Sequence, residues 1–593
     1  MKRHIMAVAA MAGVLAACDQ ADKPGDTAEQ ADFEMAPSPA RLEQRLPDDA
    51  VAYVRIPDIW GQLSAPKGTS MAPALTTDAS DATVEKLRNG IEEALAERFA
   101  VEGDLLVGKL AGLLDGPVEV VAQPAENGSP MDVKLTLDAR LENPSAARVN
   151  ELFEALAQQG RQFNLARPMT DENPGRFLAA VASVYYTLDG DRLRAVAGLG
   201  VTPDMLSRPL PAKNPGHGAL ANIHAIDETG RGGMVWVDAE GLEQWLGKLP
   251  NADQQIPPNA RRILSLVEQA AVGFGAAGGY GRIAKRITFR EGKVPASPNT
   301  TPMPTISTAG EPDVAAGVVL PTKDVLTDWS EFFVGQTPPP MSSDQENTLE
   351  VFSGRWWLIS DESGYHVVQV PADMQASNNA LAQYPLEKQF DDGKGPFRYV
   401  VGADAMGELV DSATLGMPIF SAWAQENAEY RRFASVPQVI DAAEGADQSL
   451  NDWVTDTDVS VDEQLLFVAG DVEDVAQTNY KIYLSALESM GDVVETPIDL
   501  RQFPSFDELP FPKETRLLAH VFLKDRTLGA ELRFGGHPGE YFYAGGGMSS
   551  VAVVGILAAI AVPAYQEYTQ RAERVERLLN EEPRGEPVPD SRN

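Results

Sequence analysis

A long stretch without any charge stands near the C-terminal end of the chain and constrains its folding more than any other feature. No charged residue occurs between Glu540 and Glu567, and the part from Met548 to Tyr565 is almost entirely Val, Ile, Leu and Ala. At about 1.5 Å per residue, a helix over residues 545–566 reaches the roughly 30 Å thickness of a bilayer's hydrocarbon core. We therefore expect a transmembrane helix there, with a buried core helix as the alternative.

The charges that follow this stretch indicate which side of the membrane each part of the chain occupies. Arg571, Arg574 and Arg577 lie in a polar tail, residues 567–593, whereas no Lys or Arg lies immediately before the stretch. Positive residues beside a membrane span favour the cytoplasmic side. We therefore expect a cytoplasmic C-terminus, with the body of the chain facing the periplasm from the inner membrane.

The first 18 residues have the three-part layout of a secretory signal. Charged residues stand near the start, an apolar run continues to Val14, and small residues lead to Cys18, the single cysteine of the chain. The apolar run is too short to span a bilayer permanently, so we expect residues 1–18 to act as a removable signal peptide. With one cysteine, no disulfide can form within the chain.

The ending Leu15-Ala16-Ala17-Cys18 resembles the lipobox of bacterial lipoproteins. This resemblance implies that Cys18 receives diacylglycerol and becomes the first residue of the mature protein. Asp19 resembles the signal that retains lipoproteins of enteric bacteria in the inner membrane. Residues 19–45 begin with a stretch of Ala, Asp, Glu and Pro and should form a flexible tether. An ordinary cleavable signal with an incidental cysteine is the alternative.

Residues 555–569, GILAAIAVPAYQEYT, closely resemble the N-terminal hydrophobic helix of type IV pilins. The positions that carry the resemblance are Gly555, Pro563, Tyr565 and Tyr568. Pilins have this helix first, after a glycine that the prepilin peptidase cuts, and a glutamate at its fifth residue. Tyr541 and Gly546 occupy those places here, so cleavage is not expected. The resemblance implies contact with type IV pilus or secretion components, and a simple membrane anchor is the alternative.

Composition bounds the size and the partners of the body. The chain has 593 residues, which is too long for one hydrophobic core, so several packing units are expected. Its 86 Asp and Glu residues exceed its 49 Lys and Arg residues, giving a formal net charge of -37. Such a field repels phosphate backbones, so we expect no nucleic-acid partner.

Strands and helices recur along the body. Short apolar strands, each followed by a residue that can cap a helix, are predicted at 51–58, 234–238, 317–322 and 397–404. Apolar spacing predicts helices over 84–99 and 145–160. Alternation around turn residues predicts hairpins over 185–196 and 356–370, with turns at Asp189-Gly190 and at Asp361 to Gly364.

These elements favour an α+β fold of duplicated units, in which mostly antiparallel sheets carry helices on one face and a transmembrane helix follows at the C-terminus. The Pro- and Thr-rich segment 294–312 should join a first half, 46–293, to a second half, 313–540. Trp356 and Trp357 alternate across a predicted strand, so one ring should enter the core and the other should face outward or a neighbouring layer.

No motif in the sequence makes a catalytic or metal-binding constellation. The glycines from Gly273 to Gly278 spell a dinucleotide fingerprint, but a strand-like segment follows them, so we expect glycines in a strand or hairpin. The acidic segment at Asp456 lacks the glycine and the bidentate acid of a calcium loop. His217 and His224 could share a metal only with carboxylates from elsewhere in the fold. We expect no cofactor, and an active site assembled from distant residues stays open.

The expected function is that of a non-enzymatic, membrane-tethered envelope lipoprotein that acts through protein contacts, as an accessory to a type IV pilus or secretion system. The alternative is a periplasmic binding module for a lipid, a peptide or a glycan.

Overall fold

The structure is a computed structural model that describes residues 40–534 apart from several gaps. The longer gaps are 58–76, 100–112, 125–132, 159–162, 180–181, 248–257 and 402–420, and the shorter ones are 209, 279, 299–300, 385, 394, 458, 474, 494–495, 506–507 and 510–513. The signal peptide, most of the tether, the 545–566 segment and the polar tail therefore lie outside the described residues.

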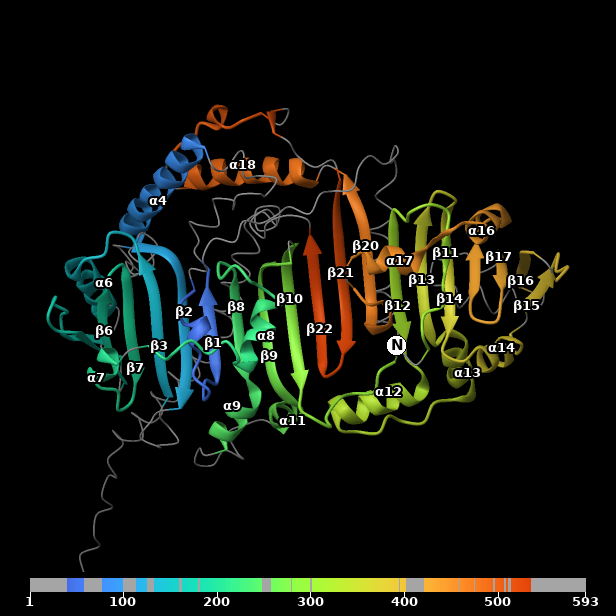
Figure 1. The fold of residues 1–593 in the computed structure, drawn as a ribbon, viewed down its shortest axis with the longest axis horizontal. Helices are drawn as coiled ribbons and strands as arrows, with labels where there is room; N and C mark the ends of the chain where they lie inside the picture. The colour runs from blue at the N-terminus through green and yellow to red at the C-terminus, as the bar shows by residue number, and fades with distance from the viewer. Residues whose placement is uncertain are drawn as a thin grey trace, which may run out of the picture.

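One 20-stranded sheet dominates the described residues (Figure 1). The first group of strands is β1 (Ala52–Ile56), β2 (Leu114–Pro124), β3 (Val133–Leu141), β4 (Phe163–Arg167), β5 (Gly175–Ala179), β6 (Ala182–Asp189), β7 (Arg192–Gly198), β8 (Gly233–Asp238), β9 (Val267–Ala277) and β10 (Tyr280–Phe289). The second group is β12 (Val314–Leu320), β13 (Gly354–Asp361), β14 (Gly364–Pro371), β15 (Leu386–Gln389), β16 (Phe397–Val401), β17 (Ser421–Glu426), β18 (Arg431–Ala434), β20 (Gln464–Glu473), β21 (Glu514–Lys524) and β22 (Thr527–Phe534). A separate pair joins β11 (Ser307–Thr308) to β19 (Gln448–Ser449).

The two groups of strands repeat the same order, and all of their pairings are antiparallel. The first group runs β4-β5-β6-β7-β3-β2-β1-β8-β9-β10. The second runs β15-β16-β17-β18-β14-β13-β12-β20-β21-β22, strand for strand the same arrangement. The last strands of the two groups, β10 and β22, pair with each other from Gly281–Phe534 to Thr288–Thr527 and close the groups into one sheet.

The predicted fold class is therefore wrong. An α+β fold of duplicated units was expected, with mostly antiparallel sheets carrying helices on one face and a C-terminal transmembrane helix, but the described residues form one large antiparallel sheet with few helices. The expectation failed because strand and cap patterns are local, whereas the β10–β22 pairing joins residues far apart in sequence. Within the described part of the chain, no helix combines the length and the apolar character needed to cross a membrane.

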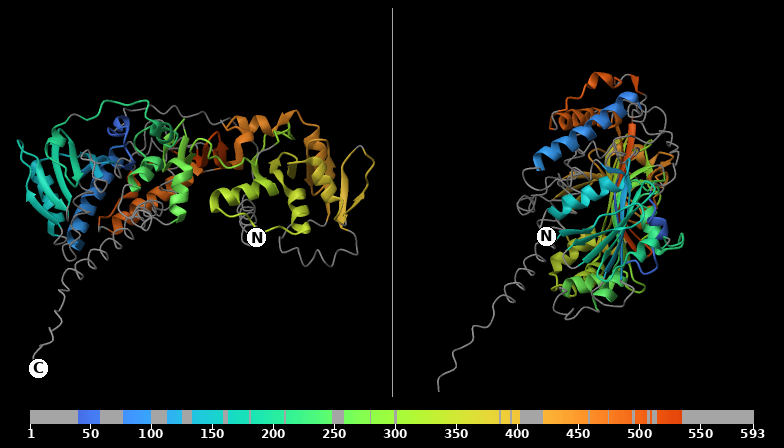
Figure 2. Two further views of the ribbon diagram at one scale, coloured as in Figure 1. Left: turned by 90° about the horizontal axis from the view of Figure 1, so that it is seen from below. Right: turned by 90° about the vertical axis from the view of Figure 1, so that its left-hand side faces the viewer.

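Helices lie on both sides of the sheet (Figure 2). The longer ones are α4 (Asp78–Phe99), α6 (Ala146–Gln158), α13 (Ser343–Phe352) and α18 (Val475–Val493). The shorter ones include α7 (Asp204–Ser207), α8 (Gly218–His224), α9 (Ala239–Leu246), α11 (Pro258–Leu266), α12 (Lys323–Trp329), α14 (Met374–Leu381), α16 (Pro437–Glu444) and α17 (Leu450–Thr455). Single turns stand at Glu43–Arg45 (η1), Ser330–Val334 (η2), Val461–Glu463 (η3) and Leu500–Gln502 (η4).

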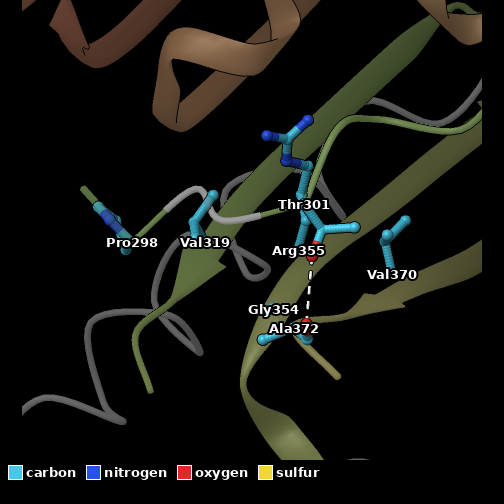
Figure 3. Close-up of a pocket in the computed structure, with 7 residues that line it drawn as sticks. All are labelled: Pro298, Thr301, Val319, Gly354, Arg355, Val370 and Ala372. Atoms are coloured by element: carbon cyan, nitrogen blue, oxygen red, sulfur yellow. Dashed lines mark hydrogen bonds between the residues drawn. The ribbon is translucent and has the colours of Figure 1, made fainter. Parts of the chain in front are cut away.

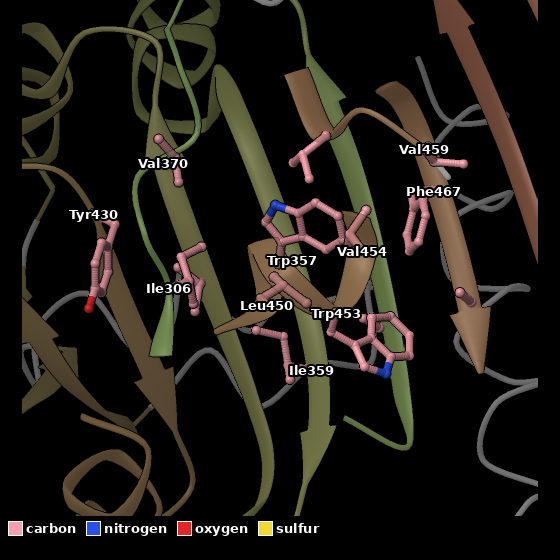
Figure 4. Close-up of a cluster of buried hydrophobic side chains, with 14 of the residues drawn as sticks. Ile306, Trp357, Ile359, Val370, Tyr430, Leu450, Trp453, Val454, Val459 and Phe467 are labelled. Atoms are coloured by element: carbon pink, nitrogen blue, oxygen red, sulfur yellow. The ribbon is translucent and has the colours of Figure 1, made fainter. Parts of the chain in front are cut away.

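One side of the sheet, which we call the packed face, carries two hydrophobic cores. In the first group, Tyr53 and Trp236 are buried with Ile223 of α8. In the second group, Trp357 is buried with Trp453 of α17, as Figure 4 shows. Each core therefore lies between strands of its own group and a short helix that follows β7 or β18.

Several local predictions are confirmed. Asp238 accepts a hydrogen bond from the Glu240 backbone N–H at the start of α9, and Thr322 accepts one from Val325 at the start of α12. The hairpins β6–β7 and β13–β14 turn where predicted, and Gly190 has a φ of 65°. Helices α4 and α6 cover the predicted stretches, and the glycines beginning at Gly273 lie in strand β9 and the turn after it.

Trp356 and Trp357 lie on opposite sides of the sheet, as their alternation along the strand predicts. Trp357 is 1% exposed on the packed face, and Trp356 lies on the opposite side, stacked with Phe352 at a ring-centroid distance of 5.7 Å and with Phe433 at 6.4 Å. Gly317 pairs directly with Trp357, and a Cβ atom at Gly317 would lie 2.8 Å from the Trp357 ring. The largest side chain of this core thus requires a glycine on the neighbouring strand.

Replacing Gly317 with valine should therefore destabilise the fold. The branched side chain would meet the buried Trp357 ring, and such overpacking costs about 1 to 3 kcal/mol. Urea unfolding measures the change, and Gly216→Val is the matched control, because nothing lies within 4 Å of a Cβ atom at Gly216. Equal free energies of unfolding for the two variants would contradict this account of the core.

Candidate functional site

The side of the sheet opposite the packed face, which we call the open face, is apolar across its centre. Directly paired residues lie side by side on one face of a sheet, so the strand register gives its rows. The row through Lys285 consists of Leu137, Val120, Val54, Val235, Val272, Lys285, Ala530, Val521, Leu466, Val318 and Trp356. The row through Ile283 consists of Phe274, Ile283, Leu532, Ala519, Val468, Ala316, Leu358, Val367 and Phe433. The first row continues from Trp356 through Gln369 to Arg431, both buried, so Lys285 is the one exposed charged residue in these two rows.

The centre of the open face is accessible to solvent. Val272 is 50% exposed and Ile283 is 44% exposed, and Lys285 and Ala530 beside them are exposed as well. A half-buried antiparallel sheet ordinarily presents polar side chains to water. Contiguous apolar surface that stays accessible marks a place where a protein contacts a partner or a ligand. The open face is therefore the candidate functional site.

The edges of the open face are covered by the protein itself. At one end, Phe153 of α6 packs against Tyr186 and against the partly buried Leu137. Along another edge, Leu264 of α11 and Phe332 of η2 pack against Ala270 and Ile287. Strands β9, β10 and β22 form the accessible floor of the site, because Val272, Ile283, Lys285 and Ala530 are exposed there, whereas Val235 of β8 and Val521 of β21 are half-buried.

The packed face has the opposite character, because its ionisable side chains are buried. The matching row across the sheet contains Asp138, Glu119, Arg55, Met234, Gly273, Ala284, Glu531, His520, Phe467, Gly317, Trp357, Val368 and Arg432. Its ionisable members are all at most 5% exposed. A buried charge is tolerated where it is paired and hydrogen-bonded, so these residues belong to networks that hold the fold.

The first network surrounds Arg55. Its guanidinium pairs with Glu43 and with Asp227, at 2.5 Å from the Asp227 carboxylate, and its Nε donates to the Gly232 carbonyl oxygen at 2.8 Å. Burial by itself lowers the pKa of Arg55, but the neighbouring acidic groups outweigh burial and raise that pKa. The network therefore keeps its charges while joining η1, β1 and the segment after α8.

Glu119 extends this network beneath η1. Its carboxylate accepts hydrogen bonds from the backbone N–H groups of Leu42 and Glu43 at 3.0 and 2.9 Å, and from the Tyr53 hydroxyl at 2.9 Å. Burial raises the pKa of Glu119, and the backbone hydrogen bonds oppose that rise. These hydrogen bonds are all internal, which suits a structural role better than a catalytic one.

The second network lies where β10 meets β22. Glu531 is 2.6 Å from Arg533 and 3.1 Å from Arg282, so one carboxylate lies between cations from both groups of strands. Burial raises the pKa of Glu531, but the arginine charges and His520 outweigh burial and lower it to about 2. His520 lies 3.6 Å from Glu531, which is too long for a hydrogen bond, so its effect is electrostatic. Burial lowers the pKa of His520, which is therefore neutral at pH 7.

The remaining candidates from the sequence do not form a chemical site among the described residues. His217 accepts a hydrogen bond from the Ala219 N–H at the start of α8, whereas His224, at its end, lies 3.0 Å from Glu43, so the two do not converge. Over the described part of the chain, no group of three or more His, Cys, Asp or Glu is arranged to hold a metal ion. Cys18, Asp19, Gly555, Pro563, Tyr565 and Tyr568 all lie outside the described residues.

One indentation on the packed face is too small for a drug-sized ligand. It contains about 220 Å³ of empty space, counting the part open to solvent, and its lining is shown in Figure 3. The lining residues are Pro298, Thr301, Val319, Gly354, Arg355, Val370 and Ala372. Ligand sites usually occupy roughly 300 to 1,000 Å³, so we do not assign binding to this indentation.

Comparisons with known proteins do not assign a fold or a function to this chain. No protein-family model matches the chain, and no curated protein matches it. Among solved structures, the chain is similar to crystal form III of TP0453, with 12% identity and a TM-score of 0.23 over 42% of this chain and 80% of that one. Crystal form I of TP0453 gives 10% identity and a TM-score of 0.20 over 43% and 80%. Similarities at this level carry no argument about fold or function.

Replacing Glu531 with glutamine should destabilise the protein at neutral pH, because it leaves two arginines around a neutral group. Removing one partner of a buried ion pair costs about 3 to 5 kcal/mol. A carboxyl whose pKa falls from its usual 4.5 to about 2 on folding stabilises the native state above pH 4.5. That contribution is lost as the pH falls from 4.5 towards 2.

Urea unfolding at several pH values tests this expectation. The difference in free energy of unfolding between the native protein and Glu531→Gln should be large at pH 7 and should narrow below pH 4.5. Glu291 is exposed and provides the control, since Glu291→Gln should change stability by less than about 0.5 kcal/mol. A difference that does not depend on pH would show that the charge of Glu531 contributes nothing.

Proposed function

We propose that this protein is a lipid-anchored envelope protein that works by binding rather than by catalysis, with the open face as its binding surface. The observation that carries the proposal is the pair of apolar rows through Lys285 and Ile283, accessible at the centre of the sheet. Full burial of a Val, Leu or Ile side chain is worth about 1.5 to 3 kcal/mol, and covering one that is half exposed gains roughly half of that. A partner that covers several of them gains enough free energy for specific binding.

The chemistry of the open face restricts the class of partner. A glycan needs convergent polar groups, and the two rows offer only the ammonium group of Lys285 and the indole of Trp356. A peptide that adds a strand needs an unpaired sheet edge, but β9, β10, β22 and β21 each have a strand on both sides. An apolar helix or a lipid fits the face better than either.

The anchoring part of the proposal rests on the two ends of the sequence. Acylation of Cys18 would fix the mature N-terminus to a membrane, and Asp19 favours the inner membrane. In this proposal the body faces the periplasm, residues 545–566 make a second contact with the membrane, and the C-terminus is cytoplasmic. Contact with type IV pilus or secretion components stays a proposal, supported by the pilin-like positions Gly555, Pro563, Tyr565 and Tyr568.

Replacing Ile283 with aspartate should abolish binding on the open face, because a charge is placed on the accessible apolar floor. Chemical crosslinking in intact cells, followed by identification of the molecules that copurify, measures the effect. Val436→Asp is the matched control, since Val436 is 44% exposed, as Ile283 is, but lies at the start of α16. If both variants keep the same partners as the native protein, the open face is not the binding surface.

Replacing Cys18 with serine should release the protein from the membrane when residues 541–593 are also removed. The substitution removes the thiol that acylation requires, and the truncation removes the second apolar segment. Fractionation of cells, with the truncated protein that keeps Cys18 as control, separates the two contributions. A membrane-bound double variant would overturn lipid anchoring at Cys18.

A further inference from the structure

Lys285 differs from its neighbours on the open face. Val272, Ala530 and Ile283 surround it, and it forms no hydrogen bond or ion pair with any residue in the described part of the chain. Three lysines elsewhere pair with carboxylates, namely Lys323 with Glu346, Lys388 with Glu426 and Lys524 with Glu463, whereas Lys285 has apolar residues as its cross-strand neighbours. In a chain with a net charge of -37, an unpaired cation in an apolar field calls for an anion from outside the protein.

We propose that the open face binds a long-chain fatty acid, whose carboxylate pairs with Lys285 and whose acyl chain lies along the apolar rows. This inference rests on the proposed function and deepens it by naming the ligand. A single cation suits a ligand with a single negative charge. The row through Lys285 continues as Val272, Val235 and Val54 on one side and as Ala530, Val521 and Leu466 on the other.

The dimensions of the face agree with an extended chain. The row extends over four strands on either side of β10, or roughly 19 Å at about 4.8 Å per strand, and its exposed part covers the strands next to β10. Each methylene group that leaves water on this track contributes about 0.8 kcal/mol. A bound acyl chain would cover these neighbours and lower the effective dielectric constant around Lys285, which would strengthen its attraction for a carboxylate relative to that in water.

A protein helix would not both cover the apolar rows and pair the Lys285 ammonium group, as a fatty acid does. A wholly apolar helix lying across the two rows would bury the Lys285 ammonium group without a counter-ion, and burying an unpaired charge is costly. A second copy of the sheet, packed face to face, would add another lysine to the same surroundings. A fatty acid supplies an apolar chain that covers the two rows and a negative charge that pairs with Lys285.

Photocrosslinking of the full-length protein in cells tests the proposal. The probes are a fatty acid and a fatty alcohol with the same photoreactive chain, so that only the carboxylate distinguishes them. Tryptic cleavage gives the peptide from Ile263 to Arg282, which carries Val272 of the open face and excludes the membrane segment. We expect the fatty acid to label this peptide at least tenfold more than the alcohol does.

Variants at Lys285 identify the contact. Lys285→Glu should reduce labelling by the fatty acid at least tenfold and leave labelling by the alcohol unchanged, whereas Lys285→Arg should retain labelling by the fatty acid. Lys293→Glu is the control, because Lys293 is also exposed but lies in the turn after β10. Loss of labelling in Lys285→Glu together with a loss of labelling by the alcohol would indicate a damaged face and would count against the assignment.

The remaining outcomes separate the two proposals. Equal labelling by both probes, insensitive to Lys285→Glu, would overturn the carboxylate ligand but keep the open face as an apolar binding surface. Stronger labelling by a photoreactive anionic phospholipid than by the fatty acid would overturn the single-chain ligand. Absence of labelling from the Val272 peptide, combined with unchanged partners in Ile283→Asp, would overturn both.

Discussion

The pairing of β10 with β22 is the interaction on which the rest of the sheet depends. It joins the last strand of each group from Gly281–Phe534 to Thr288–Thr527, and without it the strands would form two separate sheets. The repeated strand order gives this contact a pseudo-two-fold character. Tyr280 and Thr527 each begin the second strand of a hairpin, so they occupy equivalent positions in the two groups. Counted from these positions, Ala284 is equivalent to Glu531, and the two residues also pair with each other. The buried cluster around Glu531 therefore lies at the pseudo-symmetry axis, where its charges hold strands from both groups.

The two faces of this sheet reverse the usual distribution of polarity. Charged residues such as Arg55, Glu119 and Glu531 are buried on the packed face, and each is held by several hydrogen bonds or ion pairs. Apolar residues such as Val272 and Ile283 are accessible on the open face. Exposed apolar area of this kind favours association. A molecule built in this way is suited to holding an apolar partner on a rigid floor.

Local features could be predicted from the sequence, and the long-range arrangement could not. The hairpin at Gly190, the cap at Asp238 and the split of the tryptophan pair depend on neighbours within a few residues, where spacing and turn chemistry are decisive. The β10–β22 pairing leaves no such local signal. The open face was missed for a related reason. Strands such as β20 are apolar on both sides, and that pattern is typical of a strand covered on both faces, so only the fold shows which side lacks a cover.

The position of the open face over the β10–β22 junction connects binding with the integrity of the fold. Lys285 follows Ala284, the residue at the pseudo-symmetry axis, and its side chain lies on the opposite side of the sheet from Glu531. A chain extending from Lys285 across Ala530 and Val521 would therefore contact strands of both groups at once. Any ligand that binds the joined sheet better than the separated groups stabilises the junction by mass action. Ligand occupancy on the open face and the ion cluster on the packed face thus stabilise the same strand pair from its two sides.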